Sequence, residues 1–272
     1  MPPMESPFGI PIETGPERYQ PPSDYVYARD PKLRFDQRRL ALVVGIIAFS
    51  MPVVLGVGGV FIQQRLSTAL SEYYYEPIFL GDFFVGCLVA IGALLMAYRG
   101  WTPNVARLAT LAGIASLVVA FVPMFGWEIE CTGYDTFGNC TQRDALYPTL
   151  GYWVHAGAAG ILFAILSFFC LFVFTKLSVD QDSGEVVATP AKRRRNAIYI
   201  TSGIVIAVCA ISIGIGDQIF GEWWNARQMT FWAEAVILGA FGVSWMTQGR
   251  VFAPLADPRD HADKAVAKGQ DV

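Results

Sequence analysis

The sequence predicts an all-helical (all-α) polytopic membrane protein whose six transmembrane helices form one bundle. Hydrophobic residues make up 54% of the 272 residues, charged residues only 16%, and the mean hydropathy is +0.41. Several uncharged apolar runs reach the roughly 18 residues that a helix needs to cross the hydrocarbon core of a bilayer. Because backbone polar groups in lipid must bond within their own segment, each run is expected to be a helix.

The apolar runs divide the chain into three parts. Spans are expected at residues 40–62, 79–98, 105–124, 149–175, 197–216 and 229–248, so that 40–248 is the transmembrane domain. Residues 1–39 are rich in proline and hold no apolar run, which predicts a disordered cytoplasmic arm. Residues 249–272 are polar and are expected to form a cytoplasmic tail.

The basic residues predict the orientation, because segments rich in Lys and Arg remain on the cytoplasmic side. With the amino terminus inside, all but three of the 20 Lys and Arg residues fall inside; the exceptions are Arg65, Arg143 and Arg227. The reverse orientation would place nearly all of them outside. The sequence therefore predicts a multi-pass protein of the plasma (inner) membrane with both termini in the cytoplasm.

Two cysteines lie in the loop between the third and fourth spans. This loop is expected to be outside, where an oxidising compartment permits a disulfide between Cys131 and Cys140. Such a bond would close an extracytoplasmic disulfide loop. The pair could instead be half of a metal site, but no third soft ligand lies nearby in the sequence.

A basic cluster precedes the fifth span, at Lys192, Arg193, Arg194 and Arg195. We expect it to lie in a loop against the anionic inner leaflet, each charge contributing about 1 kcal/mol to lipid binding. The cluster could equally act only as a determinant of topology. The sequence points to the lipid bilayer as partner, to no nucleic acid, and to no particular protein.

Three ionisable residues lie at matching depth in spans that run from outside to inside. Asp82, His155 and Glu234 are each one to two turns into their span, which places them within roughly 10 Å of the outer surface. Together they could form a polar pocket that binds a cation, relays a proton or acts as an acid/base pair. The alternative is interfacial anchoring, since carboxylates are favoured near helix amino termini and can reach water at this depth.

Established catalytic templates are mostly absent. The chain has two histidines, so a zinc site built from several histidines cannot form, and no metal or cofactor is identified. Ser71, His155 and Asp82 could in principle make a triad, but such trios arise by chance in a protein of this size. The lack of charge at mid-span argues against a proton-coupled pump.

These features favour a non-enzymatic membrane protein (a sensor, scaffold or accessory subunit) with a small polar pocket near the outer surface. Two alternatives stay open. The first is a small transporter or channel for a neutral or cationic solute, since the outer loops are acidic. The second is a membrane-embedded lipid hydrolase. Whether the chain is an enzyme is not decided by the sequence.

Small residues predict where helices approach closely in lipid. Residues 156–160, of sequence AGAAG, give span four two overlapping pairs of small residues one turn apart. Span two offers Gly86 and Ala90, and span six offers Gly239 and Gly242. We expect these positions to face neighbouring helices.

Several segments resemble a known pattern: SEYYY at 71–75, DFFVG at 82–86, YRG at 98–100, RNAIY at 195–199, FWAE at 231–234 and FGVSW at 241–245. They are similar to a pattern that recurs in a family of uncharacterised bacterial six-span membrane proteins. More loosely, they resemble the DRAM- and FRAG-type six-span proteins of eukaryotes. The resemblance implies six spans and draws attention to Asp82, His155 and Glu234, but it implies no substrate.

Overall fold

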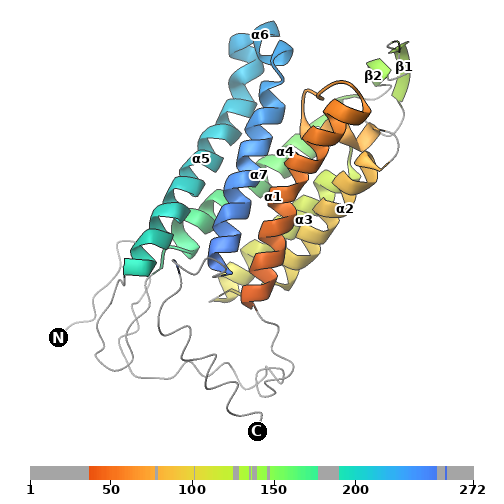
Figure 1. Ribbon diagram of the computed structural model, residues 1–272. Helices are drawn as coiled ribbons and strands as arrows, with labels where there is room; N and C mark the ends of the chain where they lie inside the picture. The colour runs from red at the N-terminus through yellow and green to blue at the C-terminus, as the bar shows by residue number, and fades with distance from the viewer. Residues whose placement is uncertain are drawn as a thin grey trace, which may run out of the picture.

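The protein is a bundle of six long helices (Figure 1): α1 (Gln37–Ile62), α2 (Leu80–Ala97), α3 (Pro103–Phe121), α4 (Pro148–Phe168), α5 (Pro190–Phe220) and α7 (Met229–Gln248). The computed structural model describes residues 37–76, 79–100, 102–124, 129–134, 136, 140–145, 148–176, 190–249 and 255. The helices are long and apolar enough to cross a membrane, which confirms the predicted fold class. Most of the predicted arm at 1–39 and tail at 249–272 lies outside the described residues.

Three shorter features lie between spans: a 3-10 helix η3 (Leu70–Tyr75), a hairpin of strands β1 (Ile129–Tyr134) and β2 (Cys140–Ala145), and α6 (Glu222–Ala226). A π-helical turn η4 (Phe169–Val173) continues α4 to the end of the fourth span. The hairpin and α6 lie at one end of the bundle, here called the hairpin end (Figure 1). The other end, where α1 begins and α7 ends, is the terminal end. The described ends of the first and last spans are therefore on the same side.

The six helices form a closed ring in chain order. Each of α1 to α4 packs against the next helix in the chain. The ring is completed by α5 packing against α7, and by α7 packing against α1. Short connections between consecutive antiparallel helices favour this arrangement. The ring leaves a shared interior that most of the spans can reach.

The bundle is held together by close backbone approaches. A Cβ atom added to Gly242 in α7 would lie 2.8 Å from the Gly45 carbonyl oxygen of α1, and one added to Gly113 in α3 would lie 2.5 Å from the Gly92 carbonyl oxygen of α2. Between α2 and α3, the buried Ser116 hydroxyl also donates a hydrogen bond of 2.8 Å to the Leu88 carbonyl. Close van der Waals packing of this kind drives helix association in lipid, where apolar burial offers little gain.

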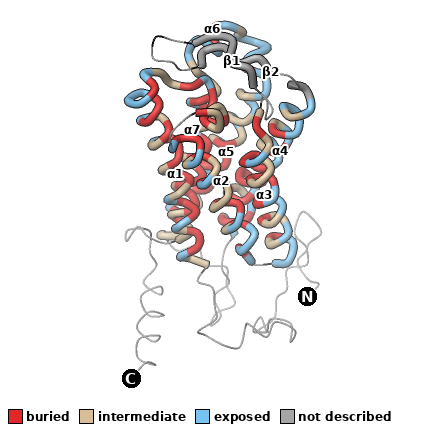
Figure 2. The backbone as a smooth tube through the Cα atoms, turned by 90° about the vertical axis from the view of Figure 1, so that its right-hand side faces the viewer, coloured by how far each residue is buried: buried red, intermediate tan, exposed pale blue. Residues whose placement is uncertain are grey.

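The outside of the spans is apolar, as a lipid-facing surface requires. Large apolar side chains are exposed on every span, among them Val53, Met96, Ile114, Ile161, Val208 and Val236. Figure 2 shows the buried residues gathered on the inner sides of the helices. We conclude that the chain is a multi-pass integral membrane protein.

The disulfide expected between Cys131 and Cys140 is not supported. The strands pair antiparallel with Cys131 opposite Arg143 and Cys140 opposite Tyr134, so the two cysteines are not cross-strand partners. An offset of three residues along a strand is roughly 10 Å, whereas the Cα atoms of a disulfide lie at most about 7 Å apart. The side chains of both strands lie outside the part that the structure describes.

The basic cluster is not in a loop, because α5 begins at Pro190 and contains it. Lys192 donates a hydrogen bond of 2.8 Å to the Phe174 carbonyl, at the end of the fourth span, where helix carbonyls lack partners. The buried Arg195 donates to the Leu255 carbonyl. Only Arg193 and Arg194 are exposed, so the four charges do not form one lipid-facing patch.

Candidate functional site

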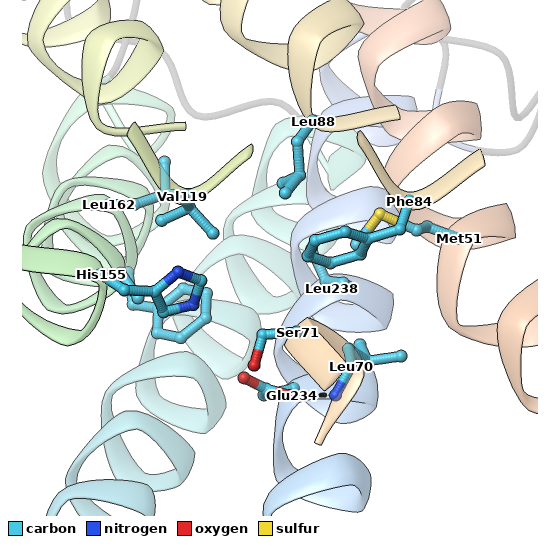
Figure 3. Close-up of a pocket in the computed structure, with 12 residues that line it drawn as sticks. Met51, Leu70, Ser71, Phe84, Leu88, Val119, His155, Leu162, Glu234 and Leu238 are labelled. Atoms are coloured by element: carbon cyan, nitrogen blue, oxygen red, sulfur yellow. Dashed lines mark hydrogen bonds between the residues drawn. The ribbon is translucent and has the colours of Figure 1, made fainter. Parts of the chain in front are cut away.

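A small cavity lies in the half of the bundle nearer the hairpin end. It is lined by Met51, Leu70, Ser71, Phe84, Leu88, Val119, His155, Ala159, Leu162, Phe163, Glu234 and Leu238, so that η3 and every span except α5 contribute (Figure 3). Its volume is about 40 Å³, enough for water or a small solute but well below the roughly 300 Å³ of the smallest usual cofactor pockets. Most of the lining is apolar, and the polar groups are Ser71, His155 and Glu234.

His155 is the most buried ionisable group of this cavity, with 5% of its surface exposed. It lies two turns into α4, and its Nδ1 is 2.6 Å from the Val122 carbonyl oxygen, just beyond the end of α3. A carbonyl can only accept, so Nδ1 carries the proton, and Nε2 of the neutral ring is an acceptor. Nε2 has no hydrogen-bond partner among the described residues.

Glu234 joins the cavity to η3. One carboxylate oxygen, Oε2, accepts a hydrogen bond of 2.6 Å from the backbone N–H of Leu70, the first residue of η3. A carboxylate is favoured there because the first N–H groups of a helix lack internal partners. The other oxygen, Oε1, has no partner among the residues that the structure describes.

Ser71 is the third polar group. Its side chain is buried, and in Figure 3 it points toward the Glu234 carboxylate. The hydroxyl donates to the sulfur of Met124 at 3.9 Å, which is a weak acceptor. The oxygen of Ser71 therefore keeps its own acceptor capacity toward the cavity.

The segment from Gln63 to Glu76 caps the cavity and is fixed in place. Phe231 N–H donates to the Thr68 carbonyl at 2.9 Å, and Arg65 pairs with the buried Glu76 at 2.8 Å. The Tyr73 hydroxyl occupies the space beside Gly59, where an added Cβ would be only 2.1 Å away. Burial raises the pKa of the Tyr73 hydroxyl above its ordinary value. The cap therefore holds Ser71 and the Leu70 N–H at defined positions.

Asp82 does not belong to the cavity. The structure brings His155 and Glu234 to one cavity, but Asp82 is exposed in the first turn of α2, while Phe84 lines the cavity from the same helix. Two residues along a helix differ by about 200° in direction, so Phe84 and Asp82 face opposite sides. The third polar residue of the cavity is Ser71 instead, and it reaches the cavity because η3 folds over the bundle.

The geometry limits the chemistry of this site. Within the described part of the chain, no three His, Cys, Asp or Glu side chains are grouped as a metal site would need. The hydroxyl of Ser71 and Nδ1 of His155 bond to Met124 and Val122, so no described hydrogen bond links Ser71, His155 and Glu234 as a triad requires. The three polar side chains therefore share one cavity without forming a hydrogen-bonded triad among the described residues.

No family model, curated protein or solved structure matches the chain. The resemblance to six-span bacterial proteins stays a prediction.

Proposed function

We propose that this chain is a non-enzymatic membrane protein, a sensor or accessory subunit, that binds a small polar solute in the cavity near the hairpin end. The observation that carries the proposal is a His155 side chain, 5% exposed, whose Nε2 has no partner among the described residues and which lines a cavity shared with Glu234. Buried polar atoms are nearly always hydrogen-bonded, so an open one beside a cavity indicates a missing partner.

Binding is favoured over conduction by the core below the cavity. In the described half of the bundle nearer the terminal end, the interior is filled by Tyr98, Phe169, Phe174, Phe241 and Trp245, each at most 4% exposed. A conducted polar solute would have to displace these packed rings. A dead-end cavity fits a receptor or an accessory subunit better than a channel.

A cavity-filling variant tests the proposal. Ala159 lines the cavity, whereas Ala164, on the same helix, is exposed to the outside. Thermal unfolding of the full chain in detergent is measured with ammonium, methylammonium, sodium, acetate and acetamide in turn. We expect at least one solute to raise the Tm of the wild type and of Ala164→Val, but not of Ala159→Val, because the added methyl groups occupy the cavity. If no solute raises the Tm, or if both variants respond equally, this function is wrong.

We also propose that the terminal end is cytoplasmic, on the distribution of Lys and Arg. Exposed Arg193 and Arg194 near this end support contact with anionic headgroups. Reporter fusions after residues 139 and 176 are expected to report opposite sides of the membrane, with the fusion after 176 inside. A cytoplasmic report from the fusion after residue 139 contradicts this orientation.

A further inference from the structure

We infer that the solute is a small cation that donates hydrogen bonds, namely ammonium or a primary alkylammonium as small as methylammonium. The inference rests on the proposed function and specifies its ligand. It follows from the balance of donors and acceptors around the cavity, from its charge, and from its walls.

The polar atoms that face the cavity are acceptors. Nε2 of the neutral His155 ring and Oε1 of Glu234 have lone pairs and no partner among the described residues. The donors nearby are already used: His155 Nδ1–H by Val122, Leu70 N–H by Glu234, and the Ser71 hydroxyl by Met124. A ligand that completes these bonds must bring the hydrogens, as an N–H group does.

The charge of the cavity also favours a cation. Glu234 is its one acidic lining residue, and no Lys or Arg is among the described residues that line it. Arg65, the arginine of the cap at residues 63–76, pairs with Glu76. A carboxylate surrounded by apolar side chains stays ionised only when a positive partner offsets its desolvation. An anion would meet repulsion from the same carboxylate.

The other lining residues favour a ligand that is small and that can contact aromatic and apolar side chains. Phe84 and Phe163 contribute aromatic rings, which attract cations through their negative faces. Leu162, Leu238 and Val119 provide apolar contacts for a methyl group. A volume of about 40 Å³ suits ammonium or methylammonium and excludes larger amines.

The test compares cations that differ in hydrogen-bond donors. The Tm of the full chain in detergent is measured with ammonium, methylammonium, tetramethylammonium and sodium chloride at equal ionic strength, and with neutral acetamide. We expect ammonium and methylammonium at about 100 times the Kd to raise the Tm by roughly 5 °C or more. Tetramethylammonium, which has no N–H group, and sodium are expected to leave the Tm unchanged.

Two carboxylate variants give the matched control. Glu234→Gln removes the negative charge but keeps an oxygen for the Leu70 N–H, and it is expected to abolish the ammonium response. Asp82→Asn makes the same chemical change at an exposed carboxylate outside the cavity, and it is expected to respond as the wild type does. An equal ammonium response in both variants would contradict the inference.

A second readout does not depend on the stability of a variant. The chain contains two histidines, His155 and His261, so nitrogen NMR of histidine-labelled wild-type protein resolves the cavity ring from an internal control. Ammonium is expected to move the Nε2 signal of His155 and not that of His261. The inference is overturned if ammonium leaves the Nε2 signal of His155 unchanged, or if sodium or tetramethylammonium raises the Tm equally. A response to acetamide alone also overturns it but leaves the proposed function standing.

Discussion

Replacing Trp245 with alanine is expected to lower the free energy of unfolding by about 3–5 kcal/mol, which is the usual cost of deleting a buried aromatic side chain. Trp245 has no exposed surface, and its ring centroid lies 5.2 Å from that of Tyr98, 5.4 Å from Phe241 and 5.5 Å from Phe174. The deletion would leave a void that these rigid rings cannot fill. Denaturant unfolding in mixed micelles measures the change.

Two further variants separate packing from other causes. Trp232, on the same helix, is 53% exposed, so Trp232→Ala is expected to change stability by less than about 1 kcal/mol. The indole N–H of Trp245 has no partner among the described residues, so Trp245→Phe loses ring volume without losing a hydrogen bond. We expect it to cost clearly less than alanine. Equal losses for Trp245→Ala and Trp232→Ala would show that the aromatic cluster is not a packed core.

Replacing Gly242 with alanine is expected to destabilise the bundle by roughly 1–3 kcal/mol, because the new methyl group cannot fit between α7 and α1. The added Cβ would lie 2.8 Å from the Gly45 carbonyl oxygen and 3.0 Å from the Phe49 backbone nitrogen. Backbone atoms cannot turn aside as a flexible side chain can, so the helices must separate. The same unfolding measurement in mixed micelles records the loss.

Gly239 is the matched control, three residues earlier on the same helix. No atom lies within 4 Å of a Cβ placed there. Gly239→Ala is therefore expected to be neutral or to stabilise the helix by up to about 1 kcal/mol, from the better helix propensity of alanine. A similar destabilisation by both substitutions would mean that helix conformation, and not close approach, limits this span.

Small residues predicted close contacts correctly at one position and missed others. Gly242 does approach α1, but Gly86, Gly157, Gly160 and Gly239 have open space beside them. The pattern of small residues did not predict the close approach of Gly92 in α2 to Gly113 in α3. A small residue permits contact with a neighbour, but it does not identify the side of the helix on which a neighbour lies.

The candidate site was predicted in part. His155 and Glu234 could be placed at one depth because a helix advances by a fixed 1.5 Å per residue. Their shared cavity required knowing that α4 and α7 both face the interior. Asp82 matched them in depth but points outward, and Ser71 enters through η3, whose fold over the bundle has no signal in the sequence. Whether the pair forms a working site stays a prediction.

The sequence by itself determined the class of the protein, the six spans and, within a few residues, most of their ends. It could do so because water and hydrocarbon differ so strongly that every span must be an uncharged apolar run. The same rule cannot detect polar residues that extend a helix beyond its apolar run. Residues 190–196 extend α5 in this way, so the predicted start at residue 197 was too late.

Only the tertiary structure decided which side of each helix faces the interior. Lipid tails and the protein interior are equally apolar, so a lipid-facing Ile161 and a buried Ile165 on the same helix cannot be distinguished by hydrophobicity. The ring order of the helices, the aromatic cluster around Trp245 and the cavity at His155 and Glu234 all depend on that choice. The side of each helix that faces the interior is set by packing between particular side chains. Such packing depends on pairs of helices and cannot be predicted from one segment alone.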